Sequence, residues 1–183
     1  KGKARQKKKK PTPEQMTAVN QANRAKICRR LLIEYFDAGD YFVTYTYKVE
    51  QRPKDMTVAL KDLQKALRKL RPKYKKANTP FYWIRNIERG TKGAWHIHLV
   101  IKKTSGAAEW IEDAWEHGAI YITQIKKSRF YDEDFTKLAN YMTKNEKTRE
   151  KRSDGSKGKP RLKEASYNHA KNMPFPEPKS QKL

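Results

Sequence analysis

Two runs of aromatic and β-branched residues, separated by a short turn, constrain the fold of this chain more than any other sequence feature. The first run is FYWIRNIE at residues 81–88, and the second is WHIHLVIK at residues 95–102. Gly90 and Gly93 lie in the turn between them. Runs of this kind around a glycine-containing turn predict a β-hairpin. The chain is therefore expected to contain an antiparallel sheet.

Further strands and helices are predicted on either side of this hairpin. Residues 41–47 (YFVTYTY) and 119–125 (AIYITQI) have strand-type composition. Capping residues and helically spaced apolar residues predict four helices, over residues 13–37, 58–71, 107–117 and 132–142. Pro72 is expected to close the second helix, which a basic loop then follows as far as Asn78.

The order of these elements predicts the fold class. Helix, strand, helix, strand, strand, helix, strand and helix follow one another along the chain. Hairpin-linked strands with helices between them predict an α+β fold, in which helices pack on one face of an antiparallel β-sheet. The inner β-α-β-β-α-β order is the split arrangement found in ferredoxin-like and RNA-recognition folds.

Charge and composition divide the chain into a folded middle and basic ends. The 183 residues carry a net charge of +23, and aromatic residues make up 11% of the chain, too many for a wholly disordered protein. We expect a basic N-terminal arm at residues 1–13 and one folded domain at residues 14–146. We expect a basic, proline-containing and poorly ordered tail at residues 147–183.

The same composition narrows the class of function. Cys28 is the only cysteine, which excludes a disulfide scaffold and a Cys-based zinc finger. No apolar run approaches the roughly 20 residues of a membrane span, and no secretory signal is present, so a cytoplasmic protein is expected. Residues 41–144 alone carry a net charge of +10, which favours a nucleic-acid partner. The basic ends serve equally well as solubility or localisation segments.

His96 and His98 are the first candidate functional residues. In a strand, residues two apart project from the same face, so the two imidazoles are expected to lie side by side while Ile97 points into the core. Two neighbouring imidazoles form half of a metal site. A pair of histidines on a solvent-exposed face explains the same pattern without a metal.

Glu88 is expected near this pair, because it ends the first strand of the hairpin and so faces the start of the second. One carboxylate with two imidazoles suits Mg²⁺ or Mn²⁺ better than a closed zinc site. An ion pair of Glu88 with Arg89 or Lys92 at the hairpin end is the alternative.

Tyr141 and Lys144 are three residues apart on the last predicted helix and therefore share one of its faces. A tyrosine at the edge of the core beside a solvated lysine accounts for this pair equally well. The pair becomes informative only together with the histidines and Glu88.

Taken together, these motifs resemble the HUH endonucleases, and among them the single-tyrosine replication initiators of rolling-circle phages and plasmids. The resemblance covers about residues 41–146 and rests on the strand 42–46 (FVTYT), the segment 95–99 (WHIHL) with Glu88 upstream, and the helix segment 141–144 (YMTK). In relaxases the tyrosine precedes the histidines, whereas here it follows them. Position 137 is Lys137, so the second tyrosine of some phage initiators is missing.

The resemblance implies metal-dependent nicking and joining of single-stranded DNA. Tyr141 would be the nucleophile that forms a 5′-phosphotyrosine bond, and Lys144 would assist it. His96, His98 and Glu88 would bind Mg²⁺ or Mn²⁺. Lysines near the site would hold the DNA strand, and the candidates are Lys73, Lys75, Lys76, Lys102, Lys103 and Lys137.

The implied partner is single-stranded DNA at a replication origin, including an origin hairpin, in the cytoplasm of a bacterial host. No Walker A pattern occurs, so a host helicase and polymerase are expected partners. Two other functions fit the sequence less well. A non-enzymatic nucleic-acid-binding module has no need for the histidines, Glu88 and Tyr141 together. A single-tyrosine HUH transposase shares the chemistry but joins the ends of a mobile element.

Overall fold

The computed structural model describes residues 7–90, 92–144, 149–151, 157–160 and 166–177. The helices are α1 (Pro13–Tyr35), α2 (Met56–Lys76), α3 (Ala107–Asp113) and α4 (Thr136–Met142), with a short 3₁₀-helix at Val49–Gln51. The strands are β1 (Tyr41–Tyr45), β2 (Trp83–Arg89), β3 (Trp95–Ile101), β4 (Ile120–Gln124), β5 (Arg149–Lys151), β6 (Lys157–Pro160) and β7 (Tyr167–His169). None of these helices combines the length and apolar character needed to cross a bilayer.

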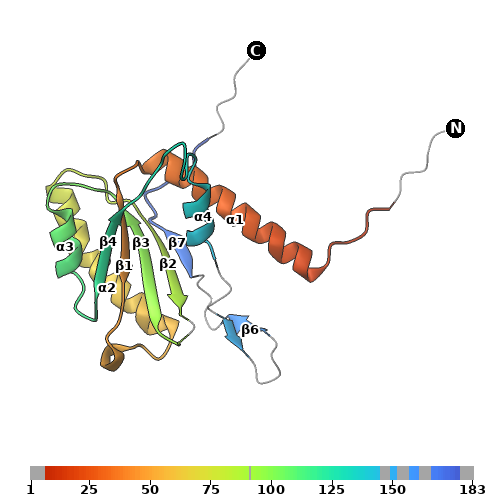
Figure 1. Cartoon of the computed structure of the whole chain (residues 1–183), viewed down its shortest axis with the longest axis horizontal. Coiled ribbons are helices and arrows are strands. Elements are labelled where there is room, and N and C mark those ends of the chain that lie inside the picture. The colour runs from red at the N-terminus through yellow and green to blue at the C-terminus, as the bar shows by residue number, and fades with distance from the viewer. Residues whose placement is uncertain (1–6, 91, 145–148, 152–156, 161–165, 178–183) are drawn as a thin grey trace, which may run out of the picture.

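Five strands form one antiparallel sheet in the order β4-β1-β3-β2-β7 (Figure 1). The predicted hairpin is confirmed as β2 and β3, which pair from Trp83 with Ile101 to Arg89 with Trp95. The inner order β1-α2-β2-β3-α3-β4 is the predicted split arrangement, and the α+β fold class is confirmed. Strands β5 and β6 form a separate two-stranded ribbon.

Helices α2 and α3 cover one face of the sheet. Alternate residues of the central strands, among them Val43, Ile97 and Leu99, are fully buried against these helices. Leu63 of α2 and Ile111 of α3 complete this core. Each large apolar side chain buried in this way contributes about 1.5–3 kcal/mol to folding.

The opposite face of the sheet is covered over only part of its area, by α4 and the C-terminal half of α1. The expectation that helices cover one face was therefore wrong. Ile84 and Val100 make one end of this second face apolar, and they are buried with residues of both helices. The other end carries the polar side chains of the candidate site. The helices cover mainly the apolar end and leave part of the polar end open, because burying polar groups without partners is costly.

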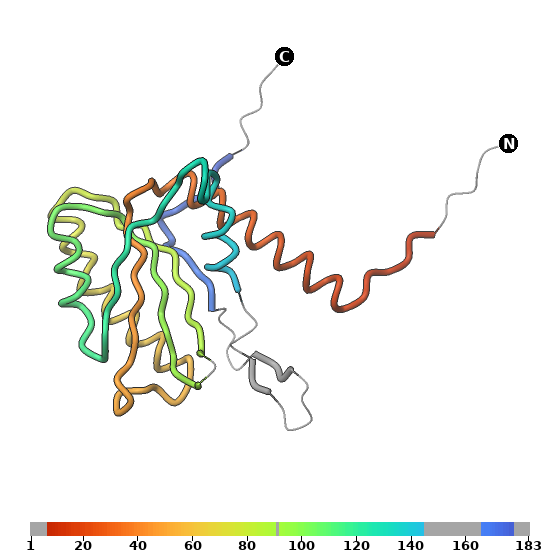
Figure 2. Tube along the Cα trace, viewed as in Figure 1, coloured from red at the N-terminus to blue at the C-terminus, as the bar shows by residue number. Residues whose placement is uncertain are grey.

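Helix α1 begins as the sequence predicts. The Thr12 hydroxyl accepts a hydrogen bond from the Gln15 backbone N–H, and the Gln15 side chain accepts one from the Thr12 backbone N–H. The N-terminal half of the helix is exposed and extends away from the sheet (Figure 2). Its buried residues begin only at Ala25. The capping motif therefore defines the start of a helix whose first turns have no core contact.

Helix α2 continues through Pro72 to Lys76, so the predicted helix end and basic loop were wrong. Proline removes one backbone hydrogen bond from a helix interior. The last turn is nevertheless held by Tyr74, which is fully buried and donates a hydrogen bond to the Lys102 carbonyl oxygen. This tertiary contact outweighs the local preference to end the helix.

The end of α3 and the C-terminal region also differ from the sequence prediction. Helix α3 ends at Asp113 rather than at residue 117. Residues Tyr167–His169 form β7 at the edge of the sheet, and Ala170 and Met173 are buried in the second core. The sheet thus includes a short piece of the region that we expected to be a poorly ordered tail.

Candidate active site

The register of the central strands places the predicted polar residues on one face of the sheet. Glu88 lies opposite His96, and His98 lies opposite both Asn86 and Thr44 on its two sides. Directly opposed residues of an antiparallel sheet project from the same face. The strand alternation that buries Ile97 and Leu99 on the other face therefore gathers these five side chains here.

His98 is the centre of this cluster. Its side chain is only 5% exposed, and its Nδ1 atom lies 3.2 Å from the Thr44 hydroxyl. Its Nε2 atom lies 3.2 Å from the Tyr141 hydroxyl and 3.9 Å from Glu88 Oε2. Because both ring nitrogens have partners, the orientation of the imidazole is fixed.

Tyr141 reaches the sheet from α4 and contacts two aromatic rings. Its ring centroid lies 5.1 Å from that of His98 and 5.8 Å from that of Phe42. The residue remains 36% exposed at the partly open face of the sheet. Burial raises the pKa of the Tyr141 phenol above its ordinary value, and the negative charge of Glu88 raises it further. The phenol is therefore neutral at physiological pH and needs a nearby positive charge to become a nucleophile.

Lys144 supplies such a charge from the end of α4. Its Nζ atom lies 5.7 Å from the centroid of the Tyr141 ring. The helix ends at Met142, so Lys144 lies just beyond it and not on its face as predicted, but its side chain still reaches Tyr141. Glu88, His96, His98, Tyr141 and Lys144 are all brought to the same partly open region.

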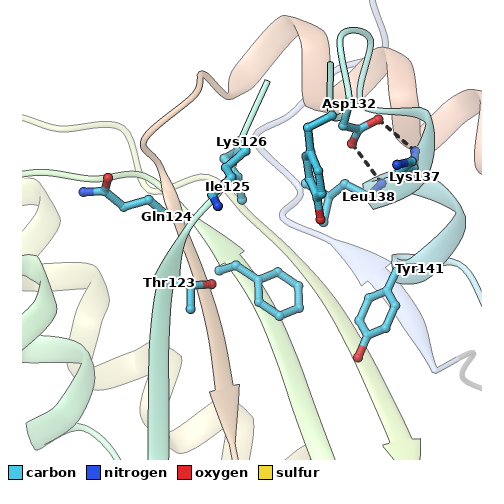
Figure 3. Close-up of a pocket in the computed structure, with 10 residues that line it drawn as sticks. Thr123, Gln124, Ile125, Lys126, Asp132, Lys137, Leu138 and Tyr141 are labelled. Atoms are coloured by element: carbon cyan, nitrogen blue, oxygen red, sulfur yellow. Dashed lines mark hydrogen bonds between the residues drawn. The ribbon is translucent and has the colours of Figure 1, made fainter. Parts of the chain in front are cut away.

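The start of α4 is held by Asp132, which is only 6% exposed (Figure 3). Its carboxylate accepts hydrogen bonds from the backbone N–H groups of Lys137 and Leu138, at 3.0 and 3.2 Å. These donors are unsatisfied within the helix itself. The prediction that Asp132 is the N-cap residue was wrong, because the helix begins at Thr136 with Phe135 at the N-cap position. The Asp132 side chain nevertheless caps the helix from further upstream.

The end of α4 is attached to the sheet by Asn86. Its side-chain amide donates hydrogen bonds to the carbonyl oxygens of Met142 and Lys144, at 2.6 and 3.1 Å. Asn86 is buried, and its strand β2 also carries Glu88. These two bonds join the helix that carries Tyr141 directly to the strand that carries Glu88.

We expect Asn86→Leu to lower the free energy of unfolding by about 2 kcal/mol, because one buried and one partly buried carbonyl group lose their donor. Urea denaturation would measure the loss. Asn140→Leu, at an exposed position of α4, is the matched control and should change stability little. Equal stability of the two variants would contradict the role given to Asn86.

The residues predicted to bind a metal have donor atoms of suitable chemistry. Two imidazoles and one carboxylate lie on one face, and the donor set suits a divalent cation with open coordination positions. Within the part of the chain that the structure describes, however, no three His, Cys, Asp or Glu side chains already surround a single point. Metal binding would require side-chain rotation at this face.

The six predicted DNA-binding lysines are not gathered in one place. Lys137 lies on α4 beside Tyr141. Lys73, Lys75 and Lys76 lie in the last turn of α2, which packs on the opposite face of the sheet. The Lys102 ammonium contacts the carboxylates of Asp40 and Asp37, at 2.9 and 3.4 Å.

Lys103 follows β3, is exposed, and its backbone N–H donates to Asp40. Among these lysines, Lys137 alone lies beside the candidate nucleophile.

A cavity of about 480 Å³ adjoins Tyr141, which sequence reasoning missed (Figure 3). Its walls come from β1, β4, α4 and the segment between the last two. The lining residues are Phe42, Thr123, Gln124, Ile125, Lys126, Tyr131, Asp132, Lys137, Leu138 and Tyr141. No sequence motif marks the cavity, because its walls meet only in the folded chain.

Thr44 and Asn86 were also missed as site residues. Both are polar and lie on strands at positions that share a face with His98. The available signal was that both residues lie on the same face of the sheet as His98, because a polar side chain on a covered face needs a partner.

Fold and site together define an α+β protein with a histidine, carboxylate and tyrosine cluster on the partly open face of its sheet. A family model described as Replication-associated protein ORF2/G2P matches residues 40–146, which include every residue of that cluster. The chain therefore belongs to this family of replication-associated proteins, and its role lies in DNA replication. Neither a curated protein nor a solved structure matches the chain.

Proposed function

We propose that this protein initiates rolling-circle replication of a phage or plasmid by nicking and rejoining single-stranded DNA. The observation that carries the proposal is the position of the Tyr141 hydroxyl, 3.2 Å from His98 Nε2 on the face that also holds Glu88. Family membership supports the replication role, and an initiator of this kind needs a nucleophile and a phosphate-activating group together.

In this proposal Tyr141 attacks the phosphorus atom of one phosphodiester. The bond from phosphorus to the 3′ oxygen breaks, and the departing oxygen takes up a proton to become a free 3′-OH. The phenol proton is lost to solvent, and the 5′ phosphate remains on the tyrosine. Because the covalent bond conserves the energy of the cleaved link, a 3′-OH can reverse the step and rejoin the strand.

His96, His98 and Glu88 would hold a divalent cation, Mg²⁺ or Mn²⁺. When bound, the cation would polarise the scissile phosphate and stabilise the charge that develops on it. Thr44 keeps the His98 ring oriented through Nδ1, which leaves Nε2 directed toward Tyr141 and Glu88. Partners that orient a ligand in this way are common around metal-binding histidines.

Lys144 would stabilise the phenolate or the phosphate that approaches it. Its ammonium lies 5.7 Å from the centre of the Tyr141 ring, and a positive charge there would favour a phenolate. Lys137, on the same helix, would contact the DNA backbone. The substrate would be single-stranded DNA at an origin, including a hairpin, in the host cytoplasm, where a host helicase and polymerase would continue replication.

Two other functions remain as alternatives. A purely binding module would gain nothing from a buried imidazole hydrogen-bonded to a tyrosine, since such a group costs free energy to bury. A single-tyrosine transposase would use the same residues, and the sequence recovered from a DNA pool would separate the two, because a transposase selects the ends of its element.

The proposal is tested with a pool of random single-stranded DNA, incubated with the protein in Mn²⁺ or in EDTA. Protein–DNA adducts that survive SDS are isolated and the attached DNA is sequenced. We expect adducts in Mn²⁺ and at least about 10²-fold fewer in EDTA. DNA binding without any adduct in Mn²⁺ would contradict the proposal and favour the binding module.

A further inference from the structure

The cavity beside Tyr141 shares two walls with the candidate active site. Phe42 lines the cavity and also stacks on the His98 ring, with centroids 5.7 Å apart and ring planes 22° apart. Tyr141 itself is the second shared wall (Figure 3). Only the Phe42 ring would therefore separate a group inside the cavity from the His98 imidazole, which contacts Tyr141.

The rim of the cavity is positively charged. The Nζ atoms of Lys137 and Lys126 lie 4.9 and 6.0 Å from the centre of the Tyr131 ring, which also lines the cavity. The one acidic lining residue is Asp132, and its carboxylate is occupied by the backbone of α4. The two ammonium groups are thus available to an anionic ligand.

The β4 wall adds a hydrogen-bonding group to this aromatic and basic surface. Thr123 is exposed and lies opposite Phe42, so its hydroxyl faces the cavity. The next residue, Gln124, lies opposite Tyr41, and its side chain points away from the cavity (Figure 3). A side-chain hydroxyl can read the edge of a nucleobase. The volume of about 480 Å³ is within the range of about 300–1,000 Å³ typical of small-ligand sites.

We propose that this cavity receives one nucleotide of the DNA strand adjacent to the scissile phosphate. The base lies against Phe42 and Tyr131, its edge meets Thr123, and its phosphate meets Lys126 and Lys137. Aromatic faces combined with lysines are the usual platform for an unpaired base. This inference rests on the proposed nicking function and adds to it the position at which the DNA sequence is read.

The cavity is tested first without any cleavage, by titrating the protein with each of the four deoxynucleoside 5′-monophosphates. Backbone amide NMR shifts should change at Thr123, Gln124 and Lys137, and should not change in α2. Thr123→Phe should abolish these changes, because the added ring projects from the Phe42 side of the sheet and fills the cavity. Thr17→Phe, on the exposed half of α1, is the matched control and should retain them.

The second test repeats the adduct sequencing with Thr123→Phe. The wild-type protein should prefer one base by about tenfold at a position next to the attachment point. The adducts that the variant forms should show no such preference, while Thr17→Phe should keep both the adduct yield and the preference. Thermal unfolding of each variant would establish that the fold is retained.

The two tests separate the failure of this inference from the failure of the proposed function. Nucleotide-dependent shifts in the cavity without any DNA adduct would overturn nicking and leave the nucleotide site standing. Adducts with an unchanged base preference in Thr123→Phe, or nucleotide shifts confined to other regions, would overturn the nucleotide site and leave nicking standing.

Discussion

Tyr141→Phe is expected to bind single-stranded DNA as tightly as the wild type and to form no covalent adduct with it. The substitution keeps the ring that packs on Phe42 and His98 and removes only the hydroxyl. Loss of a nucleophile typically lowers a rate by at least about 10³-fold. Adducts resolved on SDS gels, together with binding measured by fluorescence anisotropy, would separate the two effects.

The matched control for this prediction is Tyr121→Phe. Tyr121 lies opposite Thr44 in the sheet and is 61% exposed, so it is an accessible tyrosine on the same face. The Tyr121→Phe variant should form adducts like the wild type. An adduct that persists in Tyr141→Phe, or disappears in Tyr121→Phe, would show that the nucleophile has been misassigned.

His96→Ala is expected to lower adduct formation in Mn²⁺ by about 10²-fold or more, because the proposed cation would lose one of its three protein ligands. The free Mn²⁺ signal in electron paramagnetic resonance would measure binding directly, without reference to activity. We expect the variant to need a higher Mn²⁺ concentration for half-saturation. Thermal stability should change little, since His96 is only partly buried at the open end of the sheet.

His117→Ala is the control for the histidine substitution. His117 contacts Asp62 of α2, 3.6 Å away, and lies outside the candidate site. The His117→Ala variant should bind Mn²⁺ and form adducts like the wild type. Unchanged Mn²⁺ binding and nicking in His96→Ala would rule out the proposed metal ligands.

The sequence predicted the sheet well because strand signals here are strong and local. The hairpin of β2 and β3 follows from two apolar runs around a glycine-containing turn, and its register brought Glu88 opposite His96. β7 could not be predicted, because its three residues, Tyr167–His169, have no apolar alternation and depend on the edge of β2 for their pairing. The extension of α2 past Pro72 likewise depends on the tertiary contacts of Tyr74.

The sequence predicted which residues lie together in the candidate site, but not the contacts that hold them there. A period of two correctly placed His96 and His98 on one face. Lys144 does lie near Tyr141, but beyond the end of the helix on which the sequence placed it. How α4 packs on the sheet was not readable, because Asn86 holds that helix from a position 56 residues earlier in the chain. The cavity could not be predicted for the same reason, since it forms between segments that are far apart in the sequence.

The seven-residue length of α4 bears on how small a working version of this protein can be. An isolated helix of that size is not stable in water. It is supported by α1, from which the Gln21 side chain donates a hydrogen bond to the Thr143 hydroxyl. A fragment cut to residues 40–146 would keep every reactive group and lose α1 and β7. We therefore expect a stable form of this protein to need residues outside the segment that identifies the family.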